Sequence, residues 1–236
     1  MAMENERMSA LVQSDNDCGL SDSRHVFEAI AADLLDKGYS IKSTAVPKTL
    51  LNGLWQQLLS RPHHQFDPAG VGRQQAHTVN SSIRSDAISW IERDTAAGED
   101  WLNWAAELQQ ALNRRLFLGL FSFESHFSHY APGDFYKKHL DAFKGQPNRV
   151  LSVVLYLNPD WAPGDGGELT LYHSDQNHHG EQSQSMLTVT PSMGTLVAFL
   201  SEEFPHEVLP AKRDRYAIAG WFRVNTTSTE RADPSD

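Results

Sequence analysis

Apolar positions recur with helical spacing in three segments of the first half of the chain. Asp22 or Ser23 can cap the first helix and Gly38 can end it, while Pro47 can open the second, with Pro62 beyond its end. The third helix is expected at Asp100–Arg115. The apolar positions are Val26, Phe27, Ile30, Ala31, Leu34 and Leu35 in the first helix; Leu50, Leu51, Leu54, Trp55, Leu58 and Leu59 in the second; and Leu102, Ala105, Leu108, Ala111 and Leu112 in the third.

After residue 116 the pattern changes to short apolar runs separated by turn residues. Such runs are typical of strands, and earlier short strands are expected at Tyr39–Ile41 and Ala87–Ile91. The strands expected after residue 116 are Phe117–Tyr130, Phe135–Asp141, Arg149–Asn158, Glu168–His173, Met186–Val189, Thr195–Leu200, Glu207–Pro210 and Arg215–Val224. Eight such strands predict a mainly β fold with flanking helices, a double-stranded β-helix (jelly roll) barrel behind an N-terminal helical layer.

Length and composition fit one domain. The chain has 236 residues, of which 40% are hydrophobic and 21% charged, so a single core with a helical flank is expected. We predict a mobile arm at residues 1–22, one catalytic domain at 23–226 (helical layer 23–115, jelly-roll core 116–226) and a frayed tail at 227–236. The loop Phe66–Ser82 is rich in Gly, Gln and Ser, and we expect it to act as a lid.

Charge and cysteine usage exclude some classes of function. A net charge of -10 argues against a nucleic-acid binder, which needs a basic face to meet phosphates. Cys18 cannot form an intramolecular disulfide, and no secretory signal is evident, so a cytoplasmic protein is predicted. No apolar run approaches the roughly 20 residues of a membrane-spanning helix, and we expect no membrane partner.

The candidate chemistry lies in the β half. His139 and Asp141 are two apart in a predicted strand, so both can point to one face, and His206 can supply a third ligand. Two His and one carboxylate form the facial triad that binds Fe(II) with open positions. Arg215 begins an apolar strand and is either ion-paired, for instance to Glu168, or aimed at a bound anion. Hydrogen-bonded surface histidines are the alternative to a metal site.

These residues resemble a known family. His139, Asp141, His206 and Arg215, with the segments 155–158 and 166–169 between them, resemble the Fe(II)- and 2-oxoglutarate-dependent dioxygenases of the prolyl 4-hydroxylase group. The similarity is greatest to the oxygen-sensing prolyl hydroxylases and their bacterial relatives. It runs from about residue 83 to residue 224, and also includes the segments 83–86, 90–91 and 156–161.

The resemblance implies site roles. His139, Asp141 and His206 would bind Fe(II), and Arg215 would bind the distal carboxylate of 2-oxoglutarate. The other implied residues are Tyr156 on the same carboxylate, Tyr130 and Trp221 in the cosubstrate pocket, and Arg149, Tyr136, Arg84 and Asp86 on the substrate side. Each aromatic residue could instead fill the core, and Arg149 could be a solvated charge at a strand end. Ala219 departs from the animal enzymes, which commonly have a hydroxyl-bearing residue four positions after the arginine.

The resemblance also implies the reaction. We expect a prolyl hydroxylase that uses Fe(II), 2-oxoglutarate and O2, with ascorbate as a reductant, and acts on a proline-containing peptide loop of a cytoplasmic protein. Bacterial relatives suggest elongation factor Tu as the substrate. The alternatives are a hydroxylase of a free amino acid or other small molecule, a non-catalytic metal-binding sensor, and a zinc hydrolase, which would leave Arg215 without a function. The sequence leaves the oligomeric state open.

Overall fold

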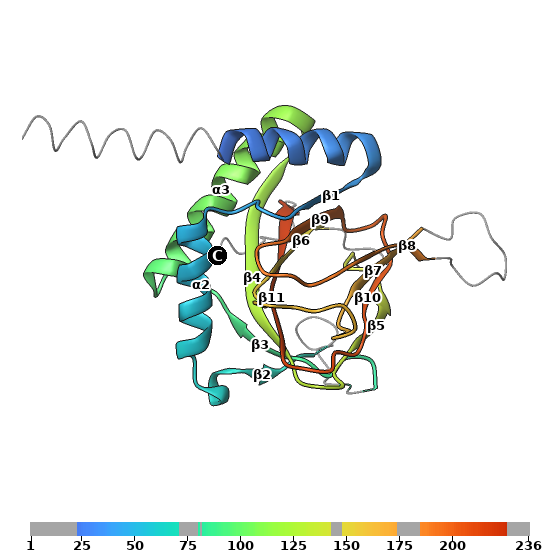
Figure 1. Cartoon of the computed structure of the whole chain (residues 1–236). Helices are drawn as coiled ribbons and strands as arrows, with labels where there is room; N and C mark the ends of the chain where they lie inside the picture. Colours follow the sequence, from blue (N-terminus) through green and yellow to red (C-terminus); the bar gives the residue numbers. More distant parts are fainter. Residues whose placement is uncertain (1–22, 71–79, 81, 143–147, 174–184, 226–236) are drawn as a thin grey trace, which may run out of the picture.

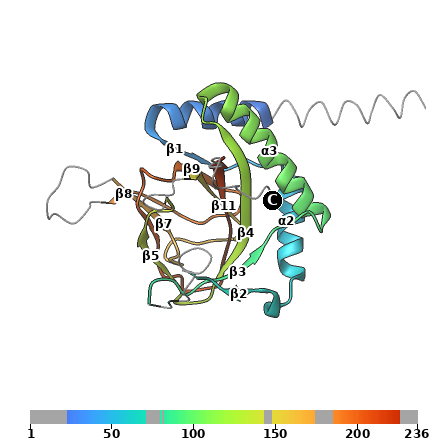
Figure 2. The same ribbon diagram turned by 180° about the vertical axis from the view of Figure 1, so that it is seen from behind.

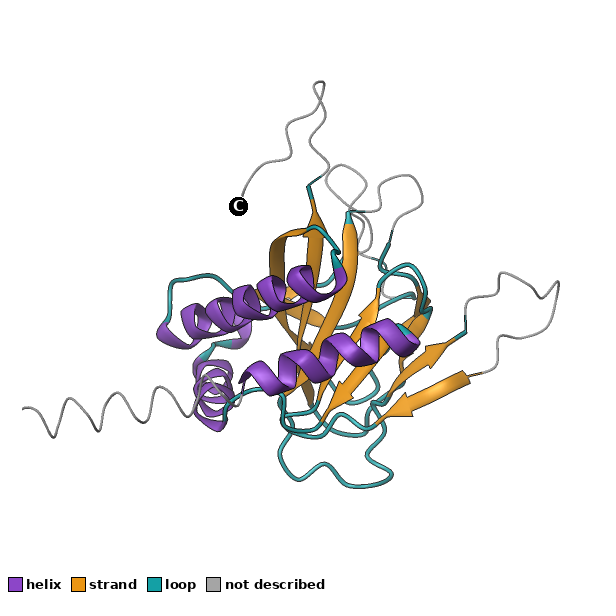
Figure 3. Cartoon of the chain, turned by 90° about the horizontal axis from the view of Figure 1, so that it is seen from above, coloured by secondary structure: helices purple, strands orange, loops and turns teal. Residues whose placement is uncertain are grey.

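Two antiparallel β-sheets face each other, and helices cover the outer side of the larger sheet (Figures 1 and 3). The computed structural model describes residues 23–70, 80, 82–142, 148–173 and 185–225. The predicted arm and tail therefore lie outside the described residues, as does most of the predicted lid, at 71–79 and 81. None of the described helices is both long enough and apolar enough to cross a lipid bilayer.

The first half of the chain contains the helices. Its elements are a helix at residues 23–37, β1 (Tyr39–Lys42), α2 (Lys48–Ser60), the 3-10 turn η1 (His63–Gln65), β2 (Asp67–Pro68), β3 (Ala87–Trp90) and α3 (Ala96–Leu116). Each predicted helix is confirmed, although α3 begins one turn before Asp100. Thr95 explains that start, since its hydroxyl accepts a hydrogen bond of 3.1 Å from the Gly98 amide.

The second half of the chain forms the predicted strands. They are β4 (Leu120–Tyr130), β5 (Tyr136–His139), β6 (Arg149–Tyr156), β7 (Leu169–Tyr172), β8 (Ser185–Val189), β9 (Leu196–Leu200), β10 (His206–Val208) and β11 (Arg215–Val224). The larger sheet has the order β1-β9-β6-β11-β4-β3-β2, and the smaller one β5-β10-β7-β8. Figure 2 shows the two sheets from behind, with β4 and β11 crossing the middle of the larger one. The prediction of a mainly β, jelly-roll fold with flanking helices is confirmed, because the strands form two facing antiparallel sheets of seven and four strands.

Three details of the sequence prediction are wrong. The strand expected from Phe117 begins at Leu120, because Phe117 ends α3 in the left-handed conformation (φ 56°). Leu35 and Leu59 follow the apolar spacing of their helices but are 66% and 58% exposed, so they lie outside the buried faces. An apolar spacing identifies a face, but the width of the face that is covered depends on the packing partner.

The larger sheet has two different faces. Its outer face packs with the helices in a core that includes Trp101, Leu108, Phe127 and Phe222. Its inner face meets the smaller sheet in a second core around Tyr156 and other residues. Successive residues of a strand alternate between these faces, so one face of β4 and β11 is available for a cavity between the sheets.

Candidate active site

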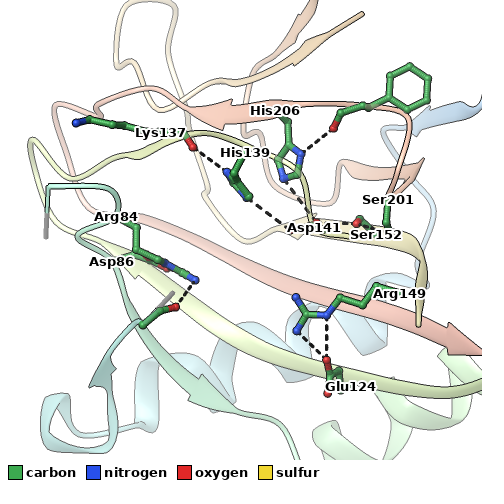
Figure 4. A network of polar contacts seen from close by, with 12 residues as sticks. Arg84, Asp86, Glu124, Lys137, His139, Asp141, Arg149, Ser152, Ser201 and His206 are labelled. Atoms are coloured by element: carbon green, nitrogen blue, oxygen red, sulfur yellow. Dashed lines mark hydrogen bonds and ion pairs between the residues drawn. The ribbon is translucent and has the colours of Figure 1, made fainter. Parts of the chain in front are cut away.

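Three predicted metal ligands meet between the sheets. His139 is the last residue of β5 and His206 the first residue of β10, and the two are direct register partners. Asp141 follows two residues after the end of β5. One ligand atom from each of the three lies within 4.8 Å of the others, and the grouping is drawn in Figure 4. The structure therefore brings together the residues that the sequence proposed.

Both imidazoles are oriented toward Asp141. The Nδ1 atoms lie 2.8 Å from the carbonyl oxygen of Lys137 for His139, and 3.0 Å from that of Phe204 for His206. Each Nδ1–H can donate to its carbonyl, which leaves Nε2 unprotonated at 3.5 Å and 3.6 Å from the Asp141 oxygens. Two imidazole nitrogens and one carboxylate on one side of a cavity form the donor set of a non-haem Fe(II) site.

The position of Asp141 does not come from strand alternation, as the sequence suggested. Asp141 lies in a bend beyond β5 and is fixed by β6, where the buried Ser152 hydroxyl donates a 2.6 Å hydrogen bond to its Oδ2. Ser152 in turn lies 2.9 Å from the Ser201 hydroxyl. The sequence analysis missed both serines. Ser152 could have been found, because it is a small polar residue inside the otherwise apolar run of β6.

The charge state of the group suits a cation. Burial alone would raise the pKa of Asp141, but His206, His139 and the Ser152 hydrogen bond together hold that pKa well below its usual range. Burial and the neighbouring His139 lower the pKa of His206 to about 4. At neutral pH the site therefore presents an ionised carboxylate and an unprotonated imidazole, the forms that bind metals.

The predicted substrate-side residues Arg84, Asp86 and Tyr136 form a support for His139. The Arg84 guanidinium makes a forked pair with the fully buried Asp86 carboxylate, at 2.7 and 2.6 Å. Arg84 also lies over the Tyr136 ring at 4.3 Å, and Tyr136 stacks on His139 with ring centroids 3.5 Å apart. These contacts restrict the orientation of a metal-ligating ring.

Arg215 is buried without a countercharge. It is 1% exposed, its Nε donates to the Gly167 carbonyl oxygen at 2.7 Å, and among the described residues no carboxylate lies within ion-pair distance. The alternative salt bridge with Glu168 is therefore not formed. The hydroxyl of Tyr156, itself fully buried, makes no hydrogen bond of ordinary geometry with a described residue. A guanidinium without a countercharge beside a buried tyrosine hydroxyl fits a bound carboxylate.

Arg149 and Trp221 lie at the other end of the same cavity. The prediction of a solvated Arg149 is wrong, because its side chain is 15% exposed, pairs with Glu124 at 2.8 Å and covers the Trp221 ring at 3.8 Å. The cavity measures about 160 Å³ and is lined by the three candidate ligands, Arg215, Tyr130, Tyr136, Trp221, Arg84 and Arg149. The predicted residues thus surround one space, with Asp86 behind Arg84 and Tyr156 beneath Arg215.

Two histidines on β4 point to opposite sides, as their spacing predicted. His129 pairs with Asp214 at 2.7 Å and stacks on Tyr216. His126 lines the cavity and is 2% exposed. The sequence analysis did not identify His126 as a cavity residue.

Comparisons with known proteins all indicate the same family. Residues 125–223 match the model of the 2OG-Fe(II) oxygenase superfamily. A prolyl 3-hydroxylase (OGFOD1) of Xenopus laevis is 34% identical over 88 residues, which are 36% of this chain and 16% of that protein. A hypoxia-inducible factor prolyl hydroxylase of Caenorhabditis elegans is 35% identical over 92 residues, which are 38% of this chain and 12% of that protein. The chain thus aligns with less than a fifth of the length of these two relatives.

Solved structures match over most of the chain. A prolyl-4-hydroxylase of Pseudomonas putida is 38% identical, with a TM-score of 0.72 and coverage of 84% of this chain and 99% of that chain. A prolyl hydroxylase of Trichoplax adhaerens, solved with a peptide of a hypoxia-inducible factor, is 25% identical with the same TM-score, 86% of this chain and 91% of that chain. Since the sequence, the fold and the triad agree, the chain belongs to the 2OG-Fe(II) oxygenase superfamily, whose members use Fe(II), 2-oxoglutarate and O2.

Proposed function

We propose that the chain hydroxylates prolyl residues of a peptide or protein with Fe(II), 2-oxoglutarate and O2. The observation that carries the proposal is a single cavity with the His139–Asp141–His206 group and an unpaired Arg215 on its walls. A metal-binding sensor does not need a second, cationic position beside the metal group. A zinc hydrolase likewise gives Arg215 no function. The names of the relatives, which are prolyl hydroxylases, support proline as the target.

Each cofactor has residues that fit it. His139 Nε2, His206 Nε2 and Asp141 would hold Fe(II), and the Arg215 guanidinium would bind the distal carboxylate of 2-oxoglutarate with a hydrogen bond from Tyr156. When bound, Fe(II) with 2-oxoglutarate and O2 supplies the oxidant that converts a C–H bond into C–OH. The 2-oxoglutarate carbons would lie over the small side chains of Ala217 and Ala219, which line the cavity between these positions.

The chain contributes orientation and the exclusion of water. Arg215, Tyr156 and Asp141 are 8% exposed or less, so the charges that hold the cosubstrate act where solvent does not screen them. The Ser152 hydroxyl and the stacked Tyr136 ring fix two of the candidate ligands before any cofactor binds. Such preorganisation reduces the cost of ordering the site during the reaction.

The rim of the cavity supports a peptide substrate. Trp90, the last residue of β3, lines the cavity and is 48% exposed. An exposed tryptophan beside a polar cavity suits the apolar ring of a prolyl residue in an accessible loop. Elongation factor Tu, a cytoplasmic location and the lid at residues 66–82 stay predictions of the sequence. So does the use of ascorbate as a reductant.

The test is a direct search for the hydroxylated product. The purified protein is incubated with Fe(II), 2-oxoglutarate, ascorbate and air, together with a cytoplasmic extract or purified elongation factor Tu, and tryptic peptides are analysed by mass spectrometry. We expect peptides that gain one oxygen atom on proline and an equal amount of succinate. The Asp141→Ala variant should give neither.

Controls separate the alternatives. Amino-acid analysis distinguishes 3-hydroxyproline from 4-hydroxyproline, which matters because relatives of both kinds match this chain. Free proline tests the small-molecule alternative, and its hydroxylation in the absence of any peptide product would replace the proposed substrate. Product formation that persists in Asp141→Ala would remove the ligand assignment.

A further inference from the structure

The cavity floor is a regular grid of side chains from three adjacent strands. On β11 the floor residues are Arg215, Ala217, Ala219 and Trp221, each two positions from the next. Rows two residues apart are separated by about 7 Å along the strands. The register places Trp221 beside Ser152, whose hydroxyl donates to the candidate ligand Asp141. The Trp221 row is therefore at the metal end of the floor, and Arg215 is at the opposite end of the floor.

A dicarboxylate that spans this floor must cross the two alanine rows. The residues on β4 opposite Ala217 and Ala219 are Ser128 and His126, and both line the cavity. His126 therefore lies in the Ala219 row, one row from the Trp221 row at the metal end and two rows, roughly 13 Å along the strand, from the Arg215 row. A ligand group held by Arg215 is at the far end, and the group beside His126 is at the metal end.

One ring nitrogen of His126, a residue that lines the cavity, has no hydrogen-bond partner among the described residues. Its Nδ1 lies 3.1 Å from the Ser128 hydroxyl and 3.2 Å from the Phe127 carbonyl oxygen, whereas Nε2 makes no hydrogen bond with a described residue. The ring is fixed between two indoles, at 5.2 Å from Trp90 and 5.4 Å from Trp221. A ring nitrogen that has no protein partner, on a side chain that lines a cavity, is available to a ligand in that cavity.

We propose that His126 is a cosubstrate-binding residue, which donates a hydrogen bond from Nε2 to the carboxylate at the oxo-acid end of 2-oxoglutarate. The inference rests on the proposed function, since it assumes that 2-oxoglutarate occupies the floor. It assigns the two ends of the cosubstrate to different strands, with Arg215 of β11 at the distal carboxylate and His126 of β4 at the metal-proximal carboxylate. Ala219 leaves the space between His126 and the ligand open.

Two neighbours of His126 favour different ring tautomers, and a bound carboxylate would select between them. When the Ser128 hydroxyl donates to Nδ1, the ring proton lies on Nε2 and can be donated to an anion. The Phe127 carbonyl oxygen favours the opposite tautomer, and a bound carboxylate beside Nε2 selects the first. Burial lowers the pKa of His126 to about 4, so the ring is neutral at physiological pH and acts as a dipolar donor.

The experiment measures binding of the cosubstrate, without turnover. The protein loaded with Mn(II) under nitrogen is titrated by calorimetry with 2-oxoglutarate and, separately, with 4-oxopentanoate, which keeps the carboxylate for Arg215 and the oxo group but lacks the oxo-acid carboxylate. His126→Leu removes the donor, and His126→Gln keeps an N–H near the position of Nε2. We expect His126→Leu to weaken 2-oxoglutarate binding about 10-fold or more while 4-oxopentanoate binding changes less than about 2-fold. His126→Gln should restore most of the affinity for 2-oxoglutarate.

Three results would overturn the inference. One is unchanged 2-oxoglutarate affinity in His126→Leu, and another is an equal loss for both ligands, which would indicate general damage to the cavity. The third is a wild-type protein that binds no 2-oxoglutarate, which would also remove the proposed function, whereas the first two leave that function intact. If His126→Leu does not fold, Ser128→Ala provides the test: it removes the donor to Nδ1 and should weaken 2-oxoglutarate binding about 3-fold. An unchanged affinity in that variant would equally contradict the proposal.

Discussion

Ser152 gives the sharpest test of how the metal group is positioned. Its hydroxyl is 2.6 Å from Asp141 Oδ2, and both residues are buried, at 2% and 8% exposure. The Ser152→Ala variant removes this hydrogen bond and leaves almost the same volume. The carboxylate oxygen then lacks its donor, in a place that water does not reach easily.

The magnitude follows from the kind of bond. A hydrogen bond to a charged group contributes about 1.5–3 kcal/mol, so the unfolding free energy of the metal-free protein should fall by about that amount. Loss of a hydrogen bond that orients a metal ligand typically weakens metal binding about 10- to 100-fold. We expect both effects in Ser152→Ala. Ser201 bonds to Ser152 at 2.9 Å and lies one step further from the metal group, so Ser201→Ala should weaken metal binding by a smaller factor.

The assay is a competition titration of Mn(II) or Co(II) against a chelator, with urea unfolding of the metal-free protein measured in parallel. Metal affinity that is unchanged in Ser152→Ala, despite a loss of stability, would show that Ser152 supports the fold and does not position Asp141. Equal weakening of metal binding in Ser152→Ala and Ser201→Ala would contradict the proposal that Ser201 acts on Asp141 only through Ser152.

Three further predictions concern the cosubstrate end and pH. Arg215→Met keeps an unbranched side chain but removes the charge, so 2-oxoglutarate binding should weaken about 100-fold, measured by calorimetry on the Mn(II)-loaded protein. Gly167→Ala should weaken the same binding about 10-fold, because Gly167 has φ 70° and an added Cβ would lie 2.9 Å from Arg215 Cδ and 3.0 Å from Ala211 Cβ. The metal-free protein should lose stability as the pH falls from about 6.5 to about 4, because the folded state keeps His126 neutral (pKa about 4) while the same residue of the unfolded chain takes up a proton. Protonation of this residue in the unfolded chain should lower the free energy of unfolding by about 3 kcal/mol over that range. Urea unfolding at several pH values measures the loss.

Matched controls exist for each of these. Metal affinity should be unchanged in Arg215→Met, and an equal loss of metal and 2-oxoglutarate binding would indicate a structural role. Gly164→Ala is the control for Gly167→Ala, because Gly164 also has a positive φ (94°) but open space around the added Cβ. The Gly164→Ala variant should lower the stability of the protein without changing its affinity for 2-oxoglutarate. His126→Gln should reduce the acid slope of stability, while His206, whose pKa is also lowered to about 4, keeps part of it. An unchanged slope would show that His126 does not contribute.

Local patterns in the sequence predicted the elements and much of the site. Periodicity, caps and turn residues act over a few positions, which is why all predicted helices and strands are present, with shifts such as that from Phe117 to Leu120 at their ends. The triad and Arg215 were also visible, because the chemistry of an Fe(II) site permits few residue types at such spacing.

The tertiary structure decided which side chains meet and what holds them. Three contacts depend on strand register and sheet packing, which local sequence patterns do not determine. They are the hydrogen bond from Ser152 of β6 to Asp141, the stacking of Tyr136 on His139, and the ion pair of Arg149 with Glu124. A period of two assigns a residue to a face of its strand but does not name the partner across the cavity. His126 shows the difference: its spacing from His129 on one strand sets the two on opposite faces, but only the pairing of β4 with β11 places His126 beside Ala219 on the floor of the site.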